Sequence, residues 1–127
     1  MYSDYIELRA RSAFSFLEGA STPEDLAARA AELGYSAMAL GDRDGLYGAP
    51  RFYAAAKAAG IRQIVGAELT LDDDSRLYVL APDRKCYQNL CRMITDSHDP
   101  AMILMLTAAG SPAERVEFDA CGCEGAF

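Results

Sequence analysis

The stretch Ala37-Met38-Ala39-Leu40-Gly41-Asp42-Arg43-Asp44-Gly45 is the clearest guide to the architecture of this 127-residue chain. Its first four residues are uniformly apolar, which is typical of a strand in a sheet that is covered on both faces. The polar residues 41–45 then predict a loop at the carboxyl end of this strand. Because a helical pattern lies on each side of it, we expect the strand to belong to consecutive βαβ units.

The two neighbouring helices have recognisable ends. We expect the first to be capped by Thr22, to carry Pro23 at its first helical position and to run to Leu33. The second is expected from about residue 50 to residue 59, and Gly60 suits the left-handed residue that ends a helix.

The remaining elements complete an alternating order. We expect strands at residues 5–8 and 61–69, a hairpin in which residues 69–71 and 77–80 flank the acidic turn 72–75, and a helix over residues 84–95. The acidic turn lacks the central glycine and distal glutamate of a calcium-binding loop, so it is interpreted as a solvated turn. Alternation of strands and helices of this length indicates an α/β fold with a parallel sheet or barrel of about three βα units.

The composition limits the function. A net charge of −7 argues against binding of a nucleic-acid backbone by this chain alone, because such binding depends on lysine and arginine. No signal peptide is recognisable and no apolar stretch approaches the roughly 18 residues of a membrane span, so we expect a cytoplasmic location without membrane contact. Cys121-Gly122-Cys123 and the lone His98 beside Asp99 are weak patterns, more typical of reduced thiols and a solvated loop than of a metal or catalytic site.

Charged residues follow three of the predicted strands, where functional groups collect in α/β folds. The first loop holds Arg9, Arg11 and Glu18, the second holds Asp42 and Arg43, and the third holds Glu68. Because the carboxyl ends of parallel strands meet at one edge, we expect these side chains to face one mouth.

Three segments resemble the motifs of a known family. Residues 7–21 (ELRARSAFSFLEGAS) resemble the first motif of the PHP domain (polymerase and histidinol phosphatase type) of bacterial DNA polymerase III alpha subunits. Residues 39–48 (ALGDRDGLYG) and 64–68 (IVGAE) resemble the second and third motifs. The surrounding sequence is most similar to the error-prone branch of this polymerase family. The resemblance covers about residues 2–95. It implies that residues 1–95 are the N-terminal part of a PHP domain and that residues 96–127 are a tail of unknown structure.

The resemblance implies a distorted seven-stranded βα barrel, of which this chain would form a part. In intact relatives the mouth of that barrel binds divalent metals such as zinc or manganese for phosphoester hydrolysis. This chain has Arg9 and Arg11 where the first motif has two histidines, and Arg43 where a histidine often ends the second motif. A guanidinium stays protonated and offers no free lone pair, so it cannot bind a metal.

The carboxylates Glu18, Asp42 and Glu68 match the remaining family positions as a remnant of the metal site. Together with the three arginines they are expected to form an ion-pair network, and no cofactor is expected in this chain. Two alternatives stay open. The carboxylates could still hold a metal, or the arginines could be solvated loop residues while the carboxylates cap helices or stay in water.

Three functions are compatible with these observations. The first is the PHP domain of an error-prone, DNA polymerase III alpha-like polymerase in replication or repair synthesis, acting as a structural or partner-binding module. Its partners would be the rest of the alpha subunit or other replication proteins, and DNA would be reached only through the full-length parent. The second is a stand-alone PHP phosphoesterase, and the third is a truncated product without function. No catalytic residue is assigned.

Overall fold

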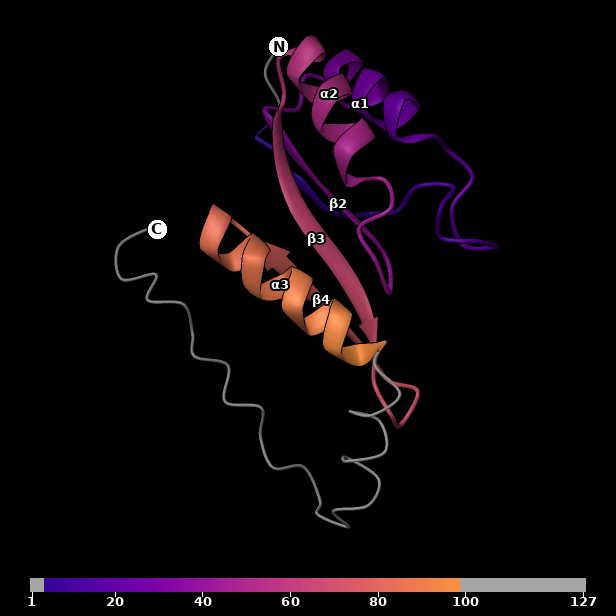
Figure 1. Cartoon of the computed structure of the whole chain (residues 1–127). Coiled ribbons are helices and arrows are strands. Elements are labelled where there is room, and N and C mark those ends of the chain that lie inside the picture. The colour runs from indigo at the N-terminus through magenta and orange to yellow at the C-terminus, as the bar shows by residue number, and fades with distance from the viewer. Residues whose placement is uncertain (1–3, 99–127) are drawn as a thin grey trace. The chain divides into compact units, whose positions relative to one another are not determined.

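The computed structural model describes residues 4–98, which form four strands and three helices (Figure 1). In chain order these are β1 (Glu7–Ala10), α1 (Pro23–Glu32), β2 (Ala37–Arg43), α2 (Ala49–Ala59), β3 (Arg62–Thr70), β4 (Arg76–Ala81) and α3 (Arg84–Ser97). The α/β class, the alternation of strands with helices and the hairpin after the third strand are confirmed.

The strands form one sheet in the order β1-β2-β3-β4. The first three strands are parallel, and β4 returns antiparallel to β3. The register pairs Glu68 with Arg43 of β2 and with Tyr78 of β4. These three side chains therefore lie in one row across the sheet and project from the same face, since side chains alternate between faces along a strand.

The opposite face of the sheet is covered by α1 and α2, which lie side by side (Figure 1). Thr22 caps α1 in a capping box with Asp25, and α2 ends at Gly60 in the left-handed conformation (φ 75°), both as the sequence predicts. The core between helices and sheet consists of Ala27, Ala30, Met38, Leu40, Phe52, Ala56 and Ile61. This packing fixes the positions of the strand ends.

Two predicted strand boundaries are wrong, and both errors concern charged residues. β1 spans Glu7–Ala10 rather than residues 5–8, so Arg9 lies within the strand. β2 continues to Arg43, although we predicted a break at Gly41. The strand continues because Gly41 pairs with Gly66, and its missing side chain leaves room for the Tyr78 ring.

Residues 83–98 belong to a second compact unit. Asp83 caps α3 by accepting a 2.8 Å hydrogen bond from the Cys86 amide, and the predicted helix over residues 84–95 extends to Ser97. His98 lies at the C-terminal end of α3, where its Nδ1 is 2.7 Å from the Ile94 carbonyl oxygen. Asp99, the Cys121–Cys123 pair and the rest of the predicted tail lie outside the described residues. Within residues 4–98, no helix is long and apolar enough to cross a membrane.

Candidate functional site

Glu68 is the centre of the candidate site at the carboxyl ends of the parallel strands. It is the third residue from the end of β3, and only 1% of its side chain is exposed. A buried carboxylate is stable only if charged or polar groups replace its lost water. Three arginines meet this requirement here.

Arg11 makes the closest contact with Glu68. Its Nη2 donates a 2.7 Å hydrogen bond to Oε1 and lies 2.6 Å from Oε2. Arg9 Nη2 donates to the same Oε1 at 3.0 Å, and Arg76 Nη1 lies 3.6 Å from Oε2. Guanidinium contacts of this kind favour the ionised carboxylate and hold its orientation.

Glu18 is the second anion of the site and is also surrounded by three arginines. Its oxygens lie 3.0 Å from Arg11 Nη1, 2.9 Å from Arg76 Nη2 and 3.3 Å from Arg43 Nη1. Arg11 and Arg76 thus contact both glutamates. We call these six residues, Arg9, Arg11, Arg43, Arg76, Glu18 and Glu68, the arginine cluster.

Asp42 is not part of the arginine cluster. It lies one residue before Arg43 on β2, so its side chain projects from the opposite face, the face of the core residue Leu40. Its buried carboxylate accepts hydrogen bonds from Ser12 N (2.8 Å), Ser12 Oγ (2.9 Å), Ser15 Oγ (2.9 Å) and Gly48 N (3.2 Å). Asp42 therefore ties the loop after β1 to the start of α2.

Tyr78 lies beside the arginine cluster on the same face of the sheet. The Arg9 guanidinium is 5.4 Å from the centre of its ring, within the range of a cation–π contact. Burial raises the pKa of Tyr78 to about 12, and the hydroxyl has no hydrogen-bond partner among the described residues. A Cβ at Gly41 would collide with this hydroxyl, so Gly41 is required for the position of the ring.

The donor set does not fit a metal ion. Among residues 4–98, no group of three or more histidine, cysteine, aspartate or glutamate side chains is placed to hold one. Glu18 and Glu68 are brought together, but through arginines, and Asp42 faces the other side of the sheet. Guanidinium groups cannot act as ligands, and they occupy the carboxylate oxygens that a metal would need.

Sequence reasoning missed Arg76 and the two serines that hold Asp42. A signal for Arg76 existed, because the hairpin register pairs it with Thr70, two residues beyond Glu68, and so places it on the same face. Ser12 and Ser15 had no comparable signal, since their role depends on the direction of the Asp42 side chain.

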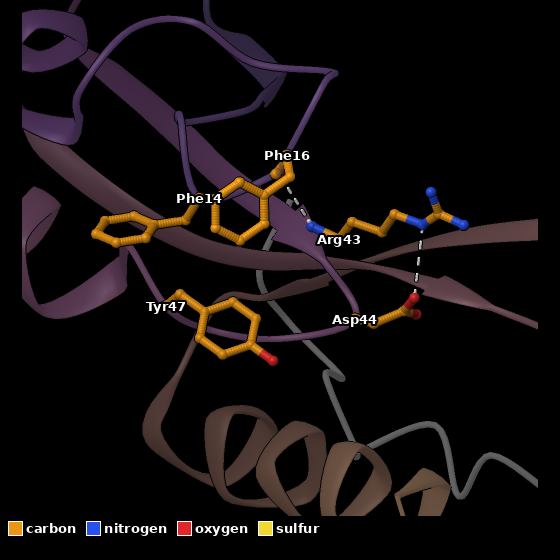
Figure 2. Close-up of a pocket in the computed structure, with 6 residues that line it drawn as sticks. Phe14, Phe16, Arg43, Asp44 and Tyr47 are labelled. Carbon is orange, nitrogen blue, oxygen red and sulfur yellow. Dashed lines mark hydrogen bonds and ion pairs between the residues drawn. The ribbon is translucent and has the colours of Figure 1, made fainter.

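A hollow of about 490 Å³ borders the arginine cluster at Arg43 (Figure 2). It is lined by Phe14, Ser15, Phe16, Arg43, Asp44 and Tyr47, and we call it the aromatic hollow. Figure 2 shows the three aromatic rings gathered on one side and the Arg43 side chain extending away from them. Asp44, in the left-handed region (φ 51°), is held by Thr70 N at 2.7 Å and Thr70 Oγ1 at 2.8 Å.

Comparison with known proteins yields one family and a set of similar sequences. A family model described as PHP domain matches residues 7–113. The error-prone DNA polymerase of Anaeromyxobacter sp. (strain K) is 54% identical over 99 residues, which are 74% of this chain and 9% of the polymerase. The error-prone DNA polymerase of Mycobacterium tuberculosis is 43% identical over 126 residues, or 91% of this chain and 11% of the polymerase. The chain therefore spans about a tenth of the length of these relatives.

A solved structure agrees with the fold. The structure of an amidohydrolase from Chromobacterium violaceum, with bound sulfate and no metal, superimposes with a TM-score of 0.55 at 28% sequence identity. The match covers 85% of this chain and 40% of the amidohydrolase chain.

Proposed function

Because this chain belongs to the PHP domain family, we propose that it is the PHP module of an error-prone DNA polymerase-like protein and that its role is structural or partner-binding. The relatives that match it are error-prone DNA polymerases, which supports a place in replication or repair synthesis. We propose the cytoplasm as its location.

The observation that carries this proposal is the arginine-filled mouth of the sheet. Metal-dependent phosphoester hydrolysis needs open coordination positions and a metal-bound water as nucleophile. Here the buried Glu68 is instead surrounded by Arg9, Arg11 and Arg76. Guanidinium groups are covalently attached to the chain and do not coordinate a water molecule as a metal ion does. They can stabilise the fold, but they cannot generate a nucleophile.

Template-directed nucleotide transfer is proposed for a larger protein rather than for this chain. The chain spans only 9% to 11% of the matching polymerases. Its net charge of −7 opposes unaided binding to a DNA backbone. We therefore propose that its partners are the remainder of a polymerase alpha subunit or other replication proteins, and that DNA is reached through them.

Two assays test the proposal. In the first, the purified chain is incubated with manganese and either p-nitrophenyl phosphate or single-stranded DNA, and we expect no release of phosphate or of 3′ nucleotides. Release that is lost in a Glu68→Gln variant would establish a metal-dependent phosphoesterase and overturn the structural role.

In the second assay, residues 4–98 replace the corresponding segment of the Anaeromyxobacter polymerase, and primer extension is measured. We expect the chimera to extend primers at the parent's rate. An Arg11→Ala chimera should be inactivated at a lower temperature than the unchanged chimera, because its PHP module is less stable. A chimera that folds but cannot extend primers would contradict the proposed structural role of this module.

A further inference from the structure

The aromatic hollow presents apolar rings to solvent. Phe16 is 83% exposed and Tyr47 is 57% exposed, although aromatic side chains of this size normally bury most of their surface. The Tyr47 ring folds back over Gly45, where any Cβ would collide with it. The backbone therefore accommodates an outward-facing ring at this position, and exposed apolar surface of this kind is typical of a binding site.

Both walls of the hollow are held by one buried group. Ser15 Oγ donates to Asp42 at 2.9 Å and accepts a 3.0 Å hydrogen bond from the Arg43 amide. The Asp42 carboxylate also accepts from Gly48 N, at the end of the loop that carries Tyr47. The backbone segments that carry the rings and Arg43 are thus fixed before a ligand arrives, which lowers the entropic cost of binding.

The side of the hollow that contains Arg43 carries several guanidinium groups. Four guanidinium groups, those of Arg9, Arg11, Arg43 and Arg76, contact three carboxylates, those of Glu18, Asp44 and Glu68. A fourth carboxylate, that of Glu7, accepts a 2.8 Å hydrogen bond from the Arg9 amide. Arg9 is 63% exposed and donates one hydrogen bond from its guanidinium within the described residues, so most of its N–H groups face solvent.

Exposed aromatic rings in the same hollow as an arginine side chain match one class of ligand. Aromatic rings stack on nucleobases, and guanidinium groups bind phosphate oxygens. A hollow of about 490 Å³ lies within the roughly 300–1,000 Å³ that small-ligand sites occupy. We propose that the aromatic hollow binds the base of a phosphorylated nucleoside, and that Arg43 with its neighbours in the arginine cluster binds the phosphate without a metal.

This binding site goes beyond the structural role proposed above and is tested separately from it. The full 127-residue chain is titrated with deoxyadenosine monophosphate, with deoxyadenosine and with inorganic phosphate, all in EDTA, and binding is followed by amide chemical shifts. We expect the monophosphate to bind at least about tenfold more tightly than either fragment, because base and phosphate contacts add.

Variants separate the two halves of the site. Phe16→Ala and Tyr47→Ala should each weaken binding of the monophosphate about tenfold and leave the affinity for inorganic phosphate unchanged. Arg43→Gln should weaken both. The matched controls are Tyr53→Ala and Arg29→Gln, which remove an exposed tyrosine of α2 and an exposed arginine of α1 away from the hollow, and neither should change any affinity. Circular dichroism verifies that each variant is folded.

A single-stranded oligodeoxyadenylate distinguishes a DNA strand end from a free nucleotide, because both offer the same base and phosphate groups. Tighter binding of the oligonucleotide assigns the site to a strand end, and equal or weaker binding assigns it to a free nucleotide. The proposal is overturned if the monophosphate binds no more tightly than the fragments, if nothing binds up to about 10 mM, or if the ring variants bind the monophosphate as well as the wild type does.

Discussion

Replacing Arg11 by alanine is the most informative single change to the arginine cluster. Arg11 is 25% exposed and contacts both buried Glu68 and partly buried Glu18, at 2.6 to 3.0 Å. Removing it takes away two ion pairs at once and leaves Glu68 with the exposed Arg9 and with Arg76 at 3.6 Å. We therefore expect a clear loss of stability.

The magnitude follows from what remains after the change. Removing one partner of a buried ion pair costs about 3–5 kcal/mol when the other charge is left alone. Hydrogen bonds to charged groups are worth about 1.5–3 kcal/mol each. Because two guanidinium groups still reach Glu68, we expect Arg11→Ala to lower the free energy of unfolding by about 2–3 kcal/mol.

Urea denaturation measures this loss. With a slope of about 1–3 kcal/mol per molar urea, the midpoint should fall by roughly 0.7–3 M. The matched control is Arg29→Ala, which removes an exposed pair with Glu32 and should cost less than about 0.5 kcal/mol. If Arg11→Ala and Arg29→Ala unfold at the same midpoint, the arginine cluster does not stabilise the fold and our account of Glu68 is wrong.

Three further changes test other parts of the structure. Asp42→Asn should lower stability by about 1–3 kcal/mol in the same urea assay. The Asp42 carboxylate accepts hydrogen bonds from a hydroxyl and from backbone amides, and the NH2 group of asparagine would face these donors with a donor of its own. Tyr78→Phe should not destabilise. Because the pKa of Tyr78 is raised in the folded protein, ionisation of this tyrosine lowers the stability of the wild type as pH rises from 10 to about 12. The Tyr78→Phe variant should lack this contribution to the pH dependence, and urea midpoints measured across the pH range test this. The double change Arg9→His with Arg11→His should lower the thermal midpoint without metal and recover part of it when zinc is added, and no zinc response would count against a vestigial metal site.

Much of the fold could be predicted because its signals are local. The Thr22 cap, the glycine at position 60 and the apolar residues 37–40 act through neighbouring residues, and the structure places them as expected. The end of β2 could not be predicted, because it depends on the pairing of Gly41 with Gly66 on another strand. A glycine that ends a strand in isolation can continue one when a ring from β4 occupies its missing side chain's place.

The residue types of the candidate site could be predicted, but the directions of its side chains could not. Arg9, Arg11 and Glu68 follow from the motifs, yet the face on which Asp42 lies depends on strand register, where one residue reverses the direction of a side chain. Arg76 joins the cluster through the hairpin from β3 to β4. A linear motif does not contain this contact.

The most direct test of the central claim, that arginines occupy the place of a metal, is calorimetric titration of the chain with manganese. Manganese is preferable to zinc because it prefers oxygen ligands and avoids the four cysteines. We predict no stoichiometric binding, since Glu18 and Glu68 are already paired with guanidinium groups. Tight binding at one or more sites that disappears in Glu68→Gln would contradict the account.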